Sequence, residues 1–124
     1  MLEENFDTLN LCNVRPEPDD LLRLVAELPR MPSITDLRFS GNSLGEKGAR
    51  ALAEVLPRLT LRSLAICNDV IQKEGLAALM DAMTRSTVKI LLLIEVGLGD
   101  NEFRSIAESL PRTPIKAMNL GTCT

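Results

Sequence analysis

Apolar residues recur along the chain at a fixed interval, in a frame that reads apolar-x-x-apolar-x-apolar. The copy in residues 34–39 consists of Ile34, Leu37 and Phe39. The same frame recurs at residues 61–66, 88–93 and 115–120, with the same number of residues between successive copies. It also occurs at residues 6–11, where the distance to the next copy is one residue longer. The last two apolar positions of each copy are two apart, so they share one face of an extended chain. The frame therefore predicts five short strands.

A second apolar pattern, with helical spacing, follows each of the first four frames. Its members lie at i, i+3, i+4 and i+7, which is one side of an α-helix. The four sets are Leu21, Leu24, Val25 and Leu28; Ala49, Leu52, Ala53 and Leu56; Leu76, Leu79, Met80 and Met83; and Phe103, Ile106, Ala107 and Leu110. Acidic residues open these segments, as the helix dipole favours; they are Asp19, Asp20, Glu46, Glu74, Asp100 and Glu102. Pro29, Pro57 and Pro111 are expected to end the helices that precede them.

The two patterns together predict a single α/β domain over residues 1–124, built from stacked strand-helix repeats. The repeats run approximately over 6–33, 34–60, 61–87 and 88–114, with a partial one over 115–124. One strand and one helix cannot bury their apolar faces alone, so neighbouring repeats must stack. Helices are about 10 Å wide and strands about 4.8 Å apart, so the stack is expected to curve. The prediction is a curved solenoid of about 4.5 repeats, with a parallel sheet on the concave face and helices on the convex face.

The stretch LRFSGNSLGEKGARALAEVL (37–56) resembles the leucine-rich repeats of the ribonuclease-inhibitor-like subfamily. In that family an asparagine follows the strand; this chain has Asn42 there, and other residues at the corresponding positions of the remaining repeats, namely Val14, Asp69, Val96 and Cys123. The resemblance implies a horseshoe segment that binds proteins. It also allows a regulator of a GTPase or another enzyme, as in Ran GTPase-activating proteins, in which Arg38, Asn42 or Asn68 would position the nucleotide of a partner. A subunit or fragment of a larger leucine-rich repeat assembly is a further alternative.

The composition narrows the available chemistry. The chain has no Trp or Tyr, and it also has no His, which is the usual proton shuttle at neutral pH. The glycine-containing loop at 41–48 lacks the adjacent Gly-Lys-Ser/Thr of a phosphate-binding loop. No nucleophile motif or metal-ligand cluster is apparent. We therefore expect no catalytic residue, no cofactor and no metal. The net charge of −3 and the pI near 5.0 also argue against a nucleic-acid partner.

The N-terminal sequence and the cysteines bear on location. The first residues are acidic, unlike a signal peptide, and the longest apolar run, Ile90–Ile94, is too short to span a bilayer. Three cysteines, an odd number without CxxC spacing, fit a reducing compartment, and a cytoplasmic location is predicted. Cys12 and Cys67 are expected about 9.6 Å apart, two strand spacings, which exceeds the reach of a disulfide.

The residues between the core positions of each strand are expected to line the concave face. In the fourth strand they are Ile90, Leu92 and Ile94, flanked by Ala65 and Ala117. An exposed apolar row of this kind usually marks a contact with a partner protein. A strand register slipped by one, or a terminal segment folded over the row, would explain the pattern without a partner.

Polar residues complete the predicted protein-binding site, as a rim around the apolar row. They are Asn10, Asp36, Arg38, Glu95 and Asn119. Arg62, Lys89 and Lys116 share one repeat position and form a basic ladder. The ladder is either a solvated edge or a contact for an acidic peptide. The fifth strand has no helix after it, so its edge is expected to be buried by homodimerisation or by further repeats.

Overall fold

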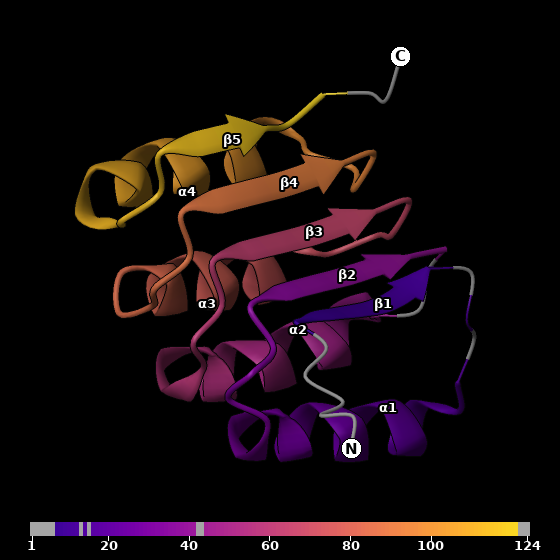
Figure 1. Cartoon of the computed structure of the whole chain (residues 1–124). Helices are drawn as coiled ribbons and strands as arrows, with labels where there is room; N and C mark the ends of the chain where they lie inside the picture. Colours follow the sequence, from indigo (N-terminus) through magenta and orange to yellow (C-terminus); the bar gives the residue numbers. More distant parts are fainter. Residues whose placement is uncertain (1–6, 13, 15, 42–43, 122–124) are drawn as a thin grey trace, which may run out of the picture.

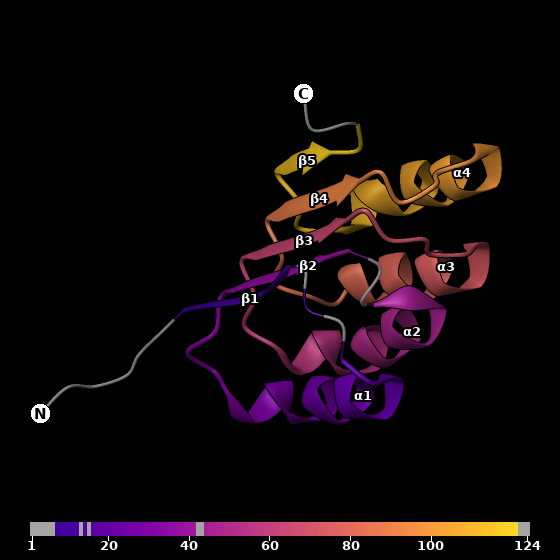
Figure 2. The same cartoon turned by 90° about the vertical axis from the view of Figure 1, so that its right-hand side faces the viewer.

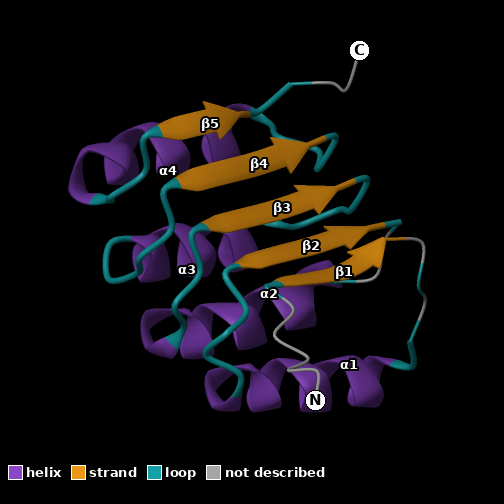
Figure 3. Cartoon of the chain, viewed as in Figure 1, coloured by secondary structure: helices purple, strands orange, loops and turns teal. Residues whose placement is uncertain are grey.

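The computed structural model describes residues 7–12, 14, 16–41 and 44–121 and contains one five-stranded sheet in the order β1-β2-β3-β4-β5. Every neighbouring pair of strands is parallel, and a helix connects each strand to the next (Figures 1 and 3). The elements are β1 Thr8–Cys12, α1 Pro18–Glu27, η1 Leu28–Arg30, β2 Asp36–Ser40, α2 Gly45–Val55, η2 Leu56–Arg58, β3 Ser63–Cys67, α3 Lys73–Met83, β4 Ile90–Ile94, α4 Asp100–Ser109, η3 Leu110–Arg112 and β5 Ala117–Asn119.

The strand register confirms the repeat interval read from the sequence. Leu37 pairs with Leu64, and Leu64 pairs with Leu91, so these steps along the sheet equal the interval between successive apolar frames. The step from β1 to β2 is longer by one, as in the sequence pattern, because Leu9 pairs with Leu37. Equivalent positions of successive repeats therefore lie side by side.

The α-helices of the described residues, α1 to α4, all lie on the same face of the sheet (Figure 2). The core fills the space between the two layers, and its strand side consists of the last two apolar positions of each frame. In the three central strands these positions are at most 1% exposed: Leu37, Phe39, Leu64, Ile66, Leu91 and Leu93. Full burial of each such side chain contributes about 1.5 to 3 kcal/mol. The prediction that these two positions share the buried face of the strand is therefore confirmed for the three central strands.

The prolines end the α-helices, as expected, but not the helical path of the chain. Pro29, Pro57 and Pro111 each lie in a three-residue 3-10 turn that directly follows α1, α2 or α4. A proline is tolerated at the start of a helical turn because the N–H that it lacks would have no partner there. Each of these three helices thus passes through one tighter turn before the chain crosses to the next strand.

Helix α4 departs from the predicted core pattern. Leu76 and Met80 of α3 are fully buried. The residue of α4 equivalent to Leu76 is Phe103, which is 56% exposed. Ala107 is also exposed. The prediction that Phe103 and Ala107 are core residues is therefore wrong. The reason is geometric: α3 has a helix on both sides, whereas within the described part of the chain α4 has a neighbour on one side only (Figure 2).

A buried carboxylate joins the turns of two neighbouring repeats. Asp69 is 2% exposed, and its carboxylate accepts the backbone N–H groups of Leu44 at 2.7 Å and Gly45 at 3.2 Å. These amides belong to the start of α2, where the helix has no internal partner for them. The oxygen atoms of Asp69 thus satisfy the start of the preceding repeat's helix.

The residue that follows each central strand has a left-handed backbone. Gly41, Asn68 and Glu95 are equivalent positions of successive repeats, with φ of 84°, 56° and 56°. Glycine adopts this conformation freely and asparagine tolerates it, but glutamate does so against the steric clash of its Cβ. The turn after β4 is therefore strained at Glu95.

Glu95→Gly is expected to raise the free energy of unfolding by about 0.5 to 1 kcal/mol. The left-handed conformation costs a residue with a Cβ about 1 to 2 kcal/mol, which exceeds the entropic cost of glycine of about 0.5 to 1 kcal/mol. Glu54→Gly, at an exposed position in α2, is the control and should lower stability by about 1 kcal/mol. Urea denaturation measures both, and equal losses in the two variants would contradict the assignment of strain.

Asp69→Ala is expected to lower the free energy of unfolding by about 2 to 3 kcal/mol, because it leaves two backbone N–H groups at the start of α2 without their acceptor. Glu54→Ala, which removes an exposed carboxylate from the same helix, should change stability by less than about 0.5 kcal/mol. Chemical denaturation distinguishes the two. A loss at Asp69 no larger than that at Glu54 would show that the turn does not need this carboxylate.

Candidate protein-binding face

The face of the sheet opposite the helices, here called the open face, carries alternate residues of every strand. The strand register places them in three rows that cross the sheet. The first row is Thr8, Asp36, Ser63, Ile90 and Ala117; the second is Asn10, Arg38, Ala65, Leu92 and Asn119; the third is Cys12, Ser40, Cys67 and Ile94. The open face therefore brings together seven of the eight predicted binding residues, and Glu95 lies directly after β4.

The apolar part of the open face lies over β4 and its neighbours. Ile90 and Leu92 are half-buried, and Ala117 is exposed. Ile94 is only 4% exposed, so the prediction that it forms part of an exposed row is wrong for this residue. A slipped register is excluded because Leu91 and Leu93 are fully buried on the helix side of the same strand. Ile90 and Leu92 thus remain as the apolar contact residues of β4.

The polar part of the open face lies over β1 and β2. The Asp36 carboxylate forms an ion pair with Arg62 at 3.7 Å, although the two residues belong to different repeats. This pair was missed from the sequence because nothing in the repeat pattern links the two positions. Arg38 is exposed in the middle of β2 and makes no ion pair with the described residues. Its guanidinium is therefore available to a partner.

Asn10 and Asn119 lie at opposite edges of the sheet and have the same local geometry. The Oδ1 atom of Asn10 accepts the N–H of Cys12 at 2.9 Å, and that of Asn119 accepts the N–H of Gly121 at 3.0 Å. These bonds orient each side chain by its own strand. Because the oxygen is engaged and both residues are exposed, each side chain can offer its NH₂ group as a donor.

The basic ladder is present where the strands begin. The backbone N–H of Lys89 donates to the carbonyl of Arg62 at 2.8 Å, and that of Lys116 donates to the carbonyl of Lys89 at 2.7 Å, so the three residues are neighbours. Arg62 forms its ion pair with Asp36 of the preceding strand. In the next two repeats the position equivalent to Asp36 is held by Ser63 and Ile90, which offer no carboxylate to Lys89 and Lys116. Within the described residues these two lysines make no ion pair. Two cations therefore border the apolar residues of the open face.

Two of the residues suggested for a role on a GTPase, Arg38 and Asn68, lie in neighbouring repeats. Arg38 lies in the middle of β2, level with Ala65. Asn68 comes directly after the end of β3, three residues beyond Ala65. Asn42 lies outside the described residues.

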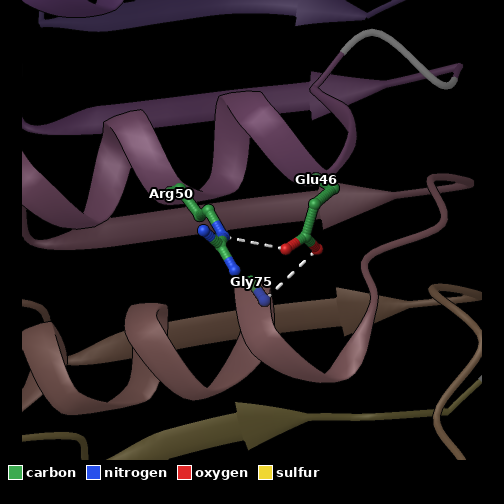
Figure 4. A network of polar contacts seen from close by, with 3 residues as sticks. All are labelled: Glu46, Arg50 and Gly75. Carbon is green, nitrogen blue, oxygen red and sulfur yellow. Dashed lines mark hydrogen bonds and ion pairs between the residues drawn. The ribbon is translucent and has the colours of Figure 1, made fainter.

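Glu46, in the glycine-containing stretch at the start of α2, bonds to the helix of the next repeat. The Glu46 carboxylate accepts the Nε–H of Arg50 at 2.9 Å and the backbone N–H of Gly75 at 3.2 Å (Figure 4). A Cβ at residue 75 would lie 2.5 Å from Oε1 of Glu46. The glycine at 75 thus allows the start of α3 to approach the carboxylate of α2, which explains it without a phosphate ligand.

Other chemistry is sparse in the described part of the chain. No group of three or more Cys, Asp or Glu side chains there is arranged to hold a metal ion. Ser40 lies between Cys12 and Cys67 in the sheet, so these two cysteines are separated by two strand spacings, as predicted. No helix among the described residues has the length and apolar content needed to cross a bilayer.

Comparison with models of known protein families finds no match, and comparison with curated protein sequences finds none either. The function must therefore be argued from the residues of this chain.

Leu92→Glu and Leu91→Glu provide a matched test of the open face. Leu92 is half-buried on the open face, so the substitution there should lower stability by about 1 kcal/mol or less. Leu91 is fully buried in the core, and a glutamate there should lower stability by more than about 4 kcal/mol. Circular dichroism during thermal unfolding measures both. Similar destabilisation of the two variants would mean that Leu92 belongs to the core.

Proposed function

We propose that the chain is a non-catalytic module that binds a partner protein or peptide through the open face. The observation that carries this proposal is the pair of half-buried apolar residues Ile90 and Leu92, on a sheet face that no described helix covers. Lys89 and Lys116 border them at one end of β4, and Glu95 lies beyond the other end. An apolar centre with a charged rim is the usual composition of a protein-binding surface.

The architecture we propose for the module is a leucine-rich repeat solenoid of the ribonuclease-inhibitor-like type. Three features support it: the constant interval between paired strand positions, one strand and one helix in each repeat, and helices on a single face. An interval of about 27 to 28 residues also falls within the range typical of leucine-rich repeats. Helices occupy about twice the width of strands, which favours a curved stack with the open face concave. A concave face surrounds a partner and contacts it from several strands at once.

The partner that fits this face is a segment with apolar side chains and carboxylates. Its apolar side chains would cover Ile90 and Leu92, and its carboxylates would lie near Lys89 and Lys116. Charge attraction at these exposed lysines weakens with salt, because the screening length falls from about 10 Å at 0.1 M to about 3 Å at 1 M. The Arg38 guanidinium and the amides of Asn10 and Asn119 would donate hydrogen bonds to the rest of the segment. A role on a GTPase, in which Arg38, Asn42 or Asn68 would position the nucleotide of a partner, stays the alternative.

Peptides selected from a random displayed library on the immobilised chain test the proposal. Affinity measured by fluorescence anisotropy should fall at least tenfold, about 1.4 kcal/mol, for Leu92→Glu. It should also fall for Lys89→Glu with Lys116→Glu and when the salt concentration is raised.

Val70→Glu is the control, because Val70 is 65% exposed in the loop between β3 and α3 and is not one of the open-face residues. Its affinity for the selected peptides should equal that of the unsubstituted chain. Peptides that bind all variants equally well, or a library that yields no binder, would argue against the open face as the binding surface.

A further inference from the structure

The outer side of α4 carries an apolar surface with no neighbour among the described residues. Phe103 is 56% exposed, Ala107 is exposed, and Leu110 at the end of the helix is half-buried. These residues lie at i, i+4 and i+7, on one side of the helix. In α3 the equivalent residues are fully buried. The structure therefore leaves at this end of the helix row a surface of the kind that a further helix covers elsewhere (Figure 2).

The opposite end of the helix row is polar. Helix α2 turns Ala51 and Val55 toward α1, and α3 has Ala78 and Ala82 at the same positions. The equivalent residues of α1 are Arg23 and Glu27, and both are exposed. Two copies stacked head to tail would bury these charges against Phe103, which is unfavourable. Contact between two α4 helices avoids that cost.

A charged stripe borders the apolar surface of α4 and alternates in sign every four residues. Its members are Asp100, Arg104 and Glu108 of α4, and Arg112 at the end of the 3-10 turn η3 that follows the helix. All four are exposed, and none makes an ion pair with the described residues. Residues four apart follow one another along the same side of a helix. In an antiparallel pair of such helices, Arg104 of one copy faces Glu108 of the other, and Asp100 lies level with the η3 turn that carries Arg112. In a parallel pair in register, like charges would meet.

We propose that α4 pairs with α4 of a second copy of this chain, antiparallel, around a two-fold axis. The axis passes near Ile106, which is midway along the stripe, so the small Ala107 lies at the crossing and allows close approach. Phe103 of each copy then packs toward the far end of the other helix, beside Leu110. Such an isologous contact closes on itself and stops at two copies. The same two-fold rotation makes the β5 strands of the two copies antiparallel. It also leaves the helices of both copies on the same side of their sheets.

Sedimentation equilibrium of the purified full chain tests the pairing. The unsubstituted chain is expected to be a dimer that dissociates as the salt concentration rises. Arg104→Glu alone and Glu108→Arg alone each place like charges opposite each other twice, because of the two-fold symmetry, and should weaken dimerisation at least tenfold. The double variant R104E/E108R restores opposite charges and should return the affinity to within about threefold of the unsubstituted chain.

A mixture of the two single variants gives a second, independent readout. R104E carries an acidic stripe and E108R a basic one, so each should be monomeric alone and the two should form a heterodimer when mixed. Phe103→Ser should weaken all of these dimers and leave the far-UV circular dichroism unchanged. Arg23→Glu, on the outer side of α1, is the matched control and should leave dimerisation unchanged.

A monomer at all protein concentrations up to hundreds of micromolar would overturn the proposal. So would a dimer that both single charge reversals leave intact, since its interface would lie elsewhere. Single variants that weaken the dimer but fail to pair with each other would overturn the antiparallel alignment. None of these readouts depends on a ligand at the open face.

Discussion

The structure depends on one constraint: a single strand-helix unit has more apolar surface than it can bury, so each unit must be covered by its neighbours. The constant repeat interval is how the sequence meets this constraint, because it places every apolar position beside its equivalent in the next repeat. Full burial follows in the middle of the stack, as at Leu64, Leu79 and Met83. Where a neighbour is missing, the same residue types are exposed, as at Phe103.

Polar contacts between repeats add positional accuracy to this apolar packing. Asp69 accepts two backbone amides of the preceding helix start, and Glu46 accepts an amide of the following one. Both carboxylates act on helix starts, where N–H groups lack internal partners and the dipole favours negative charge. Each of these repeats is thereby joined to its neighbour at the turn as well as in the core.

Among the described residues, the open face and the outer side of α4 are not covered by a neighbouring repeat, and the two surfaces differ in composition. The open face is broad, mostly polar over β1 and β2, and apolar around Ile90 and Leu92, and it is the surface proposed to bind a different protein. The outer side of α4 is narrow and apolar, and its charges are complementary to themselves in an antiparallel pair. The two surfaces lie on different layers of the molecule, so a protein partner and a second copy could bind at the same time.

The sequence by itself determined the repeat interval, the order of strand and helix, and which strand face is buried. These follow from the local spacing of apolar residues, because side chains on one face recur every 2 residues in a strand and every 3.6 residues in a helix. It also placed seven of the eight predicted binding residues on one face, since register carries equivalent positions to equivalent places. Only the tertiary structure decided how much of each side chain stays exposed. The low exposure of Ile94, the high exposure of Phe103 and the pairing of Asp36 with Arg62 depend on neighbours distant in sequence, which no local pattern encodes.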